Sequence, residues 1–263
     1  MAEATVGALL VGSYCKQGER INLNIQGSGY FQQALVDAYP DGAVRGYVIG
    51  RDGVITEGES GGPWGTGFLS VLRTKDQEGE RPYIGTVPLL TGHLAKDLTF
   101  YWAQSEQIRS AVGIAANQDE NGNITSAGGF LIQAFPGATA EEIAMVERHI
   151  TEMGSFPDQI AQNGEPLSVL SQIFQDTAFM VVEEKSLIFR CTCSWERVKR
   201  ALTLVGPAEL RDILAKDQSA SVKCDFCSKE YNVDAAMLQK LIERGEGKEE
   251  PESEGEPESE TDS

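Results

Sequence analysis

The sequence lacks a long apolar run and an excess of basic residues, and each absence excludes a class of protein. No stretch approaches the roughly 18 uninterrupted apolar residues of a membrane-spanning helix, and the first residues, MAEATVGALLVGSYCKQ, show neither a basic leader nor a signal cleavage site. Lysine and arginine number 22 against 40 aspartates and glutamates, a net charge of -18. An acidic surface repels phosphate backbones and anionic lipid, so we predict that the protein has no nucleic-acid or membrane partner. Because the sequence shows neither a leader nor a membrane-spanning run, we also predict a cytoplasmic location.

The sequence also contains only two histidines, His93 and His149, and neither stands in a catalytic motif. Each is predicted to be a surface or helix-capping residue rather than a catalytic base. The glycine-rich run GESGGPWGTG lacks the lysine of a phosphate-binding loop and the spacing of a dinucleotide-binding loop. We therefore predict that the chain is not an enzyme.

Acidic residues gather at the C-terminal end of the sequence. Residues 245–263 hold nine acidic residues and one lysine, which account for -8 of the net charge. They include no aromatic or aliphatic side chain to bury, which predicts a disordered acidic tail. The whole chain is 41% hydrophobic, enough for a sizeable core.

Strand patterns dominate the first part of the chain. The run INLNIQG alternates apolar and polar residues, and AVRGYVIG follows the turn residues PDG, which predicts neighbouring antiparallel strands. Further on, the residues DENGN separate two strand-like runs and predict a hairpin. The predicted strands cover 21–27, 43–50, 65–74, 81–89 and a hairpin over 110–135.

A helix is predicted over residues 92–107, because four apolar side chains recur there at helical spacing. They are Leu94, Leu98, Tyr101 and Trp102. We expect this helix to pack on the sheet through that face.

A second helix is predicted over residues 137–154. Thr139, with Glu142 three residues later, forms a capping box, and Gly154 ends the helix. Sheet and helices together predict an α+β domain over residues 1–166, with a mainly antiparallel sheet. PLSVLSQIFQ then predicts a short helix and DTAFMVVEEKSLIFR shows no clear period, so we place a helical linker at 167–188.

Four of the five cysteines stand in two tight pairs, C-x-C and C-x-x-C, thirty residues apart. A cytoplasmic location keeps thiols reduced, which favours metal or redox chemistry over structural disulfides. Two such pairs can supply four thiolates to a tetrahedral zinc ion at about 2.3 Å. The predicted ligands are Cys191, Cys193, Cys224 and Cys227, in a small α+β module over residues 189–244 that needs the metal to fold.

Spacing alone leaves other interpretations of the cysteines open. A thioredoxin-like C-x-x-C requires a helix that starts at its first cysteine, whereas the helix predicted after CDFC starts several residues later. From spacing alone, a purely structural zinc ribbon is the favoured interpretation, and spacing does not exclude a removable site. Cys15 lies outside the motif, on a predicted helix, and is interpreted as a small buried apolar residue.

The runs around both cysteine pairs resemble a known family. CTCSWERVKRALTLVGPAELRDILAKDQSASVKCDFCSKEYNV resembles the zinc module of the redox-regulated heat-shock holdases, the 33 kDa chaperonin family. INLNIQGSGYFQQALVDAYPDGAVRGYV, LTFYWAQSEQIRSAVGIA and AGGFLIQAFPGATAEEIAMVE resemble that family's N-terminal domain. The resemblance covers most of residues 1–244, and the cysteine motif is its most specific part.

The resemblance implies a chaperone that needs no ATP and is inactive while it is reduced and zinc-bound. Oxidation would release its one zinc ion, form the disulfides Cys191–Cys193 and Cys224–Cys227, unfold the linker, and allow a homodimer to bind unfolding client proteins. Because a disulfide that closes across a single residue is strained, we expect the C-x-x-C pair to oxidise more readily. The alternative from another class is a constitutive zinc-ribbon interaction protein whose zinc never leaves.

The same likeness assigns roles to the predicted domains. Residues 1–166 would form the client-binding domain, without the family's first strand region, because the chain starts in what resembles the end of a helix. Residues 167–188 would form a redox-sensitive linker, and residues 189–244 the redox switch.

We expect the linker to stay folded only while it packs against neighbouring domains. On release, its apolar side chains and the faces it covers would become a client-binding surface. The candidate client-binding residues are Phe174, Phe179, Met180, Val181 and Val182. The alternative for each is a permanent place in the core.

Overall fold

The computed structural model describes residues 1–51, 61–75, 81–162, 164–175 and 177–246. The chain divides into two compact units, Met1–Arg190 and Cys191–Ser263. By this division the predicted linker, residues 167–188, belongs to the first unit. The predicted acidic tail lies outside the described residues from residue 247 onward.

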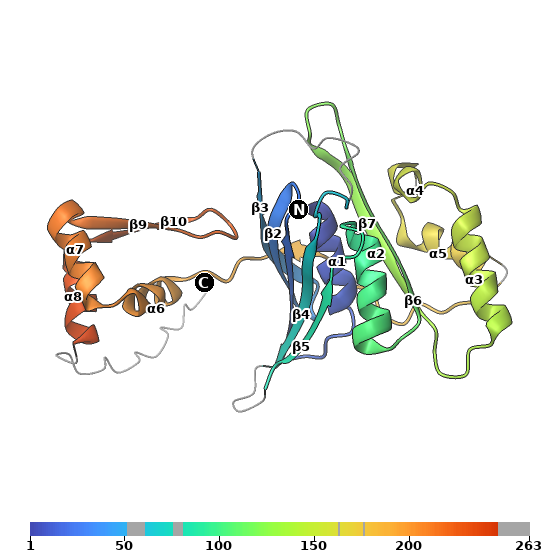
Figure 1. Ribbon diagram of the computed structural model, residues 1–263, viewed down its shortest axis with the longest axis horizontal. Helices are drawn as coiled ribbons and strands as arrows, with labels where there is room; N and C mark the ends of the chain where they lie inside the picture. Colours follow the sequence, from blue (N-terminus) through green and yellow to red (C-terminus); the bar gives the residue numbers. More distant parts are fainter. Residues whose placement is uncertain (52–60, 76–80, 163, 176, 247–263) are drawn as a thin grey trace, which may run out of the picture. The chain divides into compact units, whose positions relative to one another are not determined.

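A six-stranded sheet forms one layer of the first unit (Figure 1), in the order β5-β4-β1-β2-β3-β8. Five of its strands pair antiparallel, and β8 alone runs parallel to its neighbour β3. The strands are β1 Glu19–Gly27, β2 Phe31–Ala38, β3 Ala43–Gly50, β4 Gly67–Lys75, β5 Tyr83–Pro88 and β8 Ile188–Phe189. The mainly antiparallel α+β fold is thus confirmed.

The predicted pairing of residues 21–27 with residues 43–50 is wrong, because β2 lies between them. Leu23 on β1 faces Val36 on β2, which in turn faces Gly46 on β3. The C-terminal half of β2 is buried on both faces, from Val36 to Ala38. A strand covered on both faces loses the alternation of apolar and polar residues that identifies a strand in sequence.

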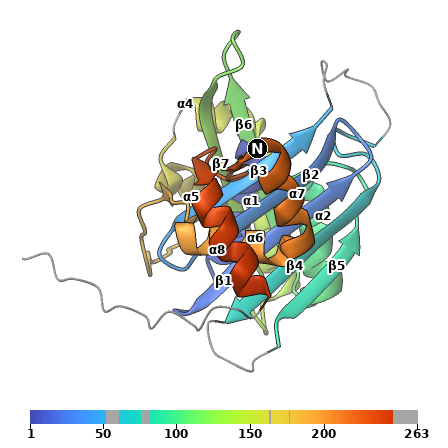
Figure 2. The same cartoon turned by 90° about the vertical axis from the view of Figure 1, so that its left-hand side faces the viewer.

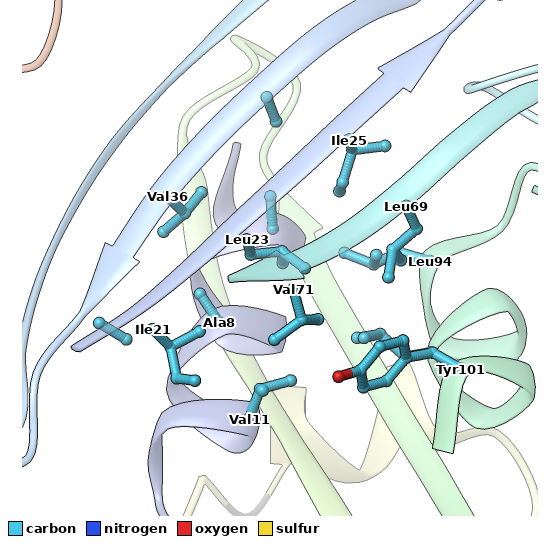
Figure 3. Close-up of a cluster of buried hydrophobic side chains, with 14 of the residues drawn as sticks. Ala8, Val11, Ile21, Leu23, Ile25, Val36, Leu69, Val71, Leu94 and Tyr101 are labelled. Carbon is cyan, nitrogen blue, oxygen red and sulfur yellow. The ribbon is translucent and has the colours of Figure 1, made fainter. Parts of the chain in front are cut away.

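Two helices cover one face of this sheet and enclose the core: α1 Ala2–Gly12 and α2 Leu94–Tyr101, which continues as a π-helical turn over Trp102–Glu106. Figure 3 shows side chains of β1 and β4 pointing toward these helices, among them Leu23 and Val71. The predicted helix around residues 94–101 is confirmed. All four of its predicted apolar residues are buried: Leu94, Leu98, Tyr101 and Trp102.

The predicted hairpin is confirmed, but it forms a sheet of its own. Strands β6 Ser110–Gln118 and β7 Ile124–Gln133 pair antiparallel and pack on the side of α1 and α2 that faces away from the main sheet (Figure 1). In the turn, the Asp119 carboxylate accepts hydrogen bonds from the backbone N–H groups of Asn121 and Asn123. The first unit therefore has a helical layer between two sheets.

Three further helices follow the hairpin: α3 Ala140–Glu152, α4 Phe156–Gln162 and α5 Pro166–Phe174. The predicted capping box of α3 is confirmed, with the Thr139 hydroxyl accepting from the Glu142 N–H at 3.2 Å. Gly154 follows the helix with a φ of 77°, as a helix-ending glycine should. Helix α4 was not predicted.

Removing the cap should weaken α3 measurably. Thr139→Ala is expected to lower the free energy of unfolding by about 1 kcal/mol, the usual cost of losing a threonine N-cap. Urea denaturation of the reduced protein measures this change. Thr151→Ala in the same helix is the control, because its hydroxyl bonds only the Glu147 carbonyl within the helix. Equal losses in the two variants would contradict a capping role.

His149 was predicted to be a surface or helix-capping residue; the surface position is wrong, and the capping alternative fits its contact with the last turn of α5. Its side chain is buried, and its Nδ1 lies 2.9 Å from the Ile173 carbonyl oxygen near the end of α5. Helix α5 packs on α3 and covers the imidazole, a contact that spans 24 residues of sequence. His93, by contrast, is exposed at the N-cap of α2, as predicted.

The second unit is a small α+β module. It consists of α6 Trp195–Val205, α7 Pro207–Asp217, β9 Ser219–Lys223, β10 Glu230–Asp234 and α8 Ala235–Gly245. Helices α7 and α8 pack side by side (Figure 2), and the Asp234 carboxylate caps α8 at the Met237 N–H, 2.8 Å away. The buried core is Val198, Leu202, Leu210, Tyr231, Val233, Leu238, Leu241 and Ile242.

Across the residues described here, no helix is both long enough and apolar enough to span a bilayer.

Candidate metal centre

The two cysteine pairs lie on two short turns of the second unit. Cys191 and Cys193 directly precede α6, where the Ser194 hydroxyl accepts from the Arg197 N–H at 3.4 Å and begins the helix. Cys224 and Cys227 lie on the turn between β9 and β10.

Hydrogen bonds close that second turn tightly. The Cys224 N–H donates to the Lys229 carbonyl at 2.9 Å, and the Ser228 N–H donates to the Cys224 carbonyl at 2.8 Å. Ser228 takes a left-handed backbone conformation, with a φ of 60°. This turn brings the thiols of Cys224 and Cys227 to the same side of the β9–β10 turn.

All four predicted ligands meet at one point. Their four Sγ atoms lie within 4.8 Å of one another, and all four side chains are half-buried. Two of the separations are 3.5 Å, between Cys193 and Cys227, and 3.7 Å, between Cys191 and Cys224. A tetrahedral zinc ion with Zn–S bonds of about 2.3 Å separates its sulfur ligands by about 3.8 Å, so these cysteines fit a tetrahedral metal ion.

Within the described part of the chain, no other group of three or more histidines, cysteines and carboxylates is arranged to hold a metal ion. Both of these Sγ separations join one pair to the other. A tetrahedral site spaces all of its ligands almost equally, so these distances are compatible with a metal site and do not select disulfide partners. The predicted pairs, Cys191–Cys193 and Cys224–Cys227, stay a prediction.

A tyrosine on β10 completes the environment of the cysteines. The Tyr231 hydroxyl donates a hydrogen bond to Cys193 Sγ at 3.1 Å. This hydrogen bond lowers the pKa of the Cys193 thiol to about 7 and raises the pKa of Tyr231 to about 12, because it stabilises the thiolate and the neutral phenol.

Sequence reasoning missed Tyr231. Its alternation with Val233 in EYNVD indicates a buried strand face, but a contact across 38 residues has no local signal.

The fifth cysteine is a buried residue of the first unit. Cys15 is 8% exposed and lies just beyond the end of α1, not on the helix as predicted. Burial raises the pKa of its thiol, which disfavours the reactive thiolate. Its predicted role as a small apolar core residue is confirmed.

The predicted linker is helical only as far as Phe174, where α5 ends, and residues 177–187 form neither helix nor strand. Phe174 is half-buried, and its ring centroid lies 5.9 Å from that of Phe179. The other candidate client-binding residues are exposed: Phe179 41%, Met180 80%, Val181 54% and Val182 86%. A permanent core position is therefore wrong for these four residues, and their apolar surface is already open to solvent before any release.

The linker's last residues are held at the edge of the main sheet. The Ile188 N–H donates to the Gly42 carbonyl at 3.2 Å and the Arg190 N–H to the Val44 carbonyl at 3.0 Å, which forms the parallel β3–β8 pairing. The Arg190 guanidinium also pairs with the Asp41 carboxylate at 2.5 Å. The attachment ends at the residue before Cys191.

Comparison with known proteins identifies chains that are similar to this one. The family model described as "Hsp33 protein" matches residues 1–234. The chain is 34% identical over 248 residues to the 33 kDa chaperonin of Geobacter sulfurreducens, covering 92% of this chain and 81% of the relative. It is 32% identical over 261 residues to that of Levilactobacillus brevis, covering 94% and 87%.

A solved structure shares the fold. The crystal structure of the 33 kDa chaperonin, a heat shock protein 33 homolog, from Thermotoga maritima superposes with a TM-score of 0.83 at 31% identity, over 94% of this chain and 85% of that one.

Proposed function

Because this chain belongs to the Hsp33 family of chaperones, we propose that it is a redox-regulated, ATP-independent holdase that binds unfolding proteins under oxidative stress. The observation that carries the proposal is the cluster of four Sγ atoms within 4.8 Å, which directly follows the attached end of the linker. The same four cysteines would then bind the metal, undergo oxidation and adjoin the end of the linker.

Zinc is the proposed metal. Four thiolates form a soft donor set, which in a tetrahedral arrangement selects zinc or iron–sulfur chemistry, and a single cluster of four thiols fits one zinc ion. The proposed ligands are Cys191, Cys193, Cys224 and Cys227. When bound, zinc would hold the two turns together and stabilise a unit that has only a small core.

Oxidation is the proposed trigger. Each disulfide forms from two thiolates, which give two electrons to a peroxide or hypochlorite, and each removes two ligands from the metal. We propose the pairs Cys191–Cys193 and Cys224–Cys227, with the C-x-x-C pair oxidised first because it closes with less strain.

Loss of the metal would then free the linker. Strand β8 is two residues long and pairs with β3 at two positions, so its attachment has little stability of its own. Once Cys191 leaves the metal, the chain just beyond Arg190 would lose an anchor. Clients would bind the exposed linker side chains Phe179, Met180, Val181 and Val182, and release would add Phe174 and the surface that the linker leaves.

The remaining assignments follow from the same proposal. Residues 1–166 would be the client-binding domain, residues 167–188 the redox-sensitive linker and residues 189–244 the switch. We also propose a homodimer in the oxidised state and a cytoplasmic location. The relatives are named chaperonins, which supports the prediction that the chain is not an enzyme.

The switch is tested by following zinc and client together. Hypochlorite or warm peroxide is expected to release one zinc ion per chain to a chromogenic chelator, and the oxidised protein should then suppress light scattering by a heat-denatured client. The untreated, zinc-loaded protein is the control and should leave scattering unchanged. Retained zinc, or zinc lost without suppression, would support the alternative of a constitutive zinc-ribbon interaction protein.

A further inference from the structure

Tyr231 reaches the metal centre from the core of the second unit. It lies on β10, where it pairs with Val222 on β9, so it stands beside the turn that carries Cys224 and Cys227. Its side chain nevertheless points its hydroxyl at Cys193 Sγ, on the other cysteine pair, 3.1 Å away. The residue is 3% exposed, and it is therefore a fixed link between the two halves of the centre.

The ring of Tyr231 is held from two sides. The Trp195 ring packs against it edge-on, with centroids 5.2 Å apart and an interplanar angle of 79°. The Lys229 ammonium lies 5.1 Å from the centre of the ring. Because these contacts and burial fix the ring, the hydroxyl cannot turn away from Cys193 without local unfolding.

We propose that Tyr231 is a positioning residue that slows the oxidation of Cys193 and so sets how much oxidant the switch requires. The inference rests on the proposed redox function. A hydrogen bond donated into a thiolate stabilises the charged sulfur and occupies one of its lone pairs. The sulfur then becomes a weaker nucleophile, although it remains a metal ligand.

The chemistry of this step is nucleophilic attack by sulfur. The Cys193 thiolate attacks one oxygen of hydrogen peroxide, the O–O bond breaks, and the departing hydroxide takes up a proton to become water. A neighbouring thiolate attacks the resulting sulfenic sulfur, the S–S bond forms, and a second hydroxide leaves and is protonated to water. In total, two thiolates are oxidised and one peroxide is reduced to two waters, and the Tyr231 hydrogen bond opposes the first attack.

Tyr231→Phe removes only this hydroxyl. In the full-length, zinc-loaded protein, we expect the second-order rate constant of peroxide-driven zinc release to rise about three- to tenfold, because a charge-assisted hydrogen bond is lost and nucleophilicity follows thiol basicity only in part. Trp195→Phe is the matched control, since it changes a neighbouring side chain conservatively and keeps both an aromatic ring against Tyr231 and the Tyr231 hydroxyl. Its rate constant should stay within about twofold of the parent's, and an unchanged rate in Tyr231→Phe would overturn the proposal.

A second readout separates this inference from the chaperone switch. Alkylation of the zinc-loaded protein by iodoacetamide is also an attack by sulfur, and peptide mass mapping follows it at Cys193 without any client. Faster alkylation of Cys193 in Tyr231→Phe supports the inference even if the oxidised protein fails to suppress aggregation, which would defeat only the proposed function. An unchanged alkylation rate contradicts the inference whatever the client assay shows.

A variant that keeps the Tyr231 ring and its hydroxyl tests the proposal even if Tyr231→Phe does not fold. If Tyr231→Phe does not load zinc, a fluorinated tyrosine at position 231 preserves the packing and donates a stronger hydrogen bond. It is expected to slow both zinc release and alkylation relative to the parent protein, and a faster or equal rate would count against the proposal.

Discussion

Replacing both Cys224 and Cys227 by serine is expected to abolish tight zinc binding and to unfold the second unit. The two residues supply half of a ligand set whose Sγ atoms lie within 4.8 Å of one another. Structural zinc contributes an apparent ~10 to 16 kcal/mol near neutral pH in small zinc-finger peptides, which matches or exceeds the ~5 to 15 kcal/mol that stabilises a typical domain. With eight hydrophobic residues in its buried core, the second unit has little else to replace that contribution.

Zinc content by elemental analysis and amide hydrogen exchange of residues 191–246 measure the two effects. The first unit should keep its exchange protection, because its core contains none of the four ligands. Cys15→Ala is the matched control: it removes a buried thiol outside the cluster and should leave one zinc ion per chain. Stoichiometric zinc in the double variant would show that the ligand assignment is wrong.

Gly42→Ala is expected to detach the end of the linker and to give the reduced protein chaperone activity. Gly42 has a φ of +83°, and a Cβ atom at this position would lie 2.4 Å from the Ser186 carbonyl oxygen. Alanine in the left-handed region costs about 1 to 2 kcal/mol, and the clash involves backbone rather than a flexible side chain. Two residue pairs join β8 to β3. Breaking this short pairing should therefore cost less free energy than distorting the backbone at position 42, and the linker is expected to move away.

Limited proteolysis within residues 177–187 reports detachment, and light scattering of a heated client reports activity, both with zinc bound. Gly122→Ala controls for backbone strain, because Gly122 has a φ of +80° in the β6–β7 turn but no atom within 4 Å of its added Cβ. We expect that variant to lose stability without gaining activity. If Gly42→Ala is as protease-resistant and inactive as its parent, linker release does not control the chaperone.

Asp41→Asn should have a much smaller effect than Gly42→Ala. The Asp41 carboxylate and the Arg190 guanidinium are each about half exposed, and solvent screens such a pair strongly. The hydrogen bonds of β8 to the Gly42 and Val44 carbonyls do not involve the Asp41 side chain. The close backbone approach at Gly42, rather than the ion pair, should therefore decide whether the linker stays attached.

Local chemistry explains which predictions were confirmed. The capping box of Thr139 and Glu142 involves residues three positions apart, so the sequence alone predicted it. The hairpin turn was predicted in the same way. The cysteine pairs were recognised because a metal site needs particular ligands at short spacings, and those spacings are visible in the sequence.

The predictions that were wrong concern packing rather than local sequence patterns. Strand β2 separates two strands that were expected to be neighbours, and it is covered on both faces. His149 is buried because α5 packs over it. The candidate client-binding residues from Phe179 to Val182 were expected to be covered, but they are exposed. Each outcome depends on which surfaces of a segment are covered by packing, and for His149 the covering contact spans 24 residues of sequence.

By itself the sequence determined the α+β composition, the capping box of Thr139 and Glu142, the hairpin and the two cysteine pairs that could hold a metal, because each of these follows from residue types within a few positions of one another. Only the tertiary structure decided that the four cysteines meet, that Tyr231 bonds Cys193 across 38 residues, and that the end of the linker is hydrogen-bonded to Gly42. The physical reason is that burial and hydrogen bonding between distant segments depend on how layers pack, which no local pattern encodes.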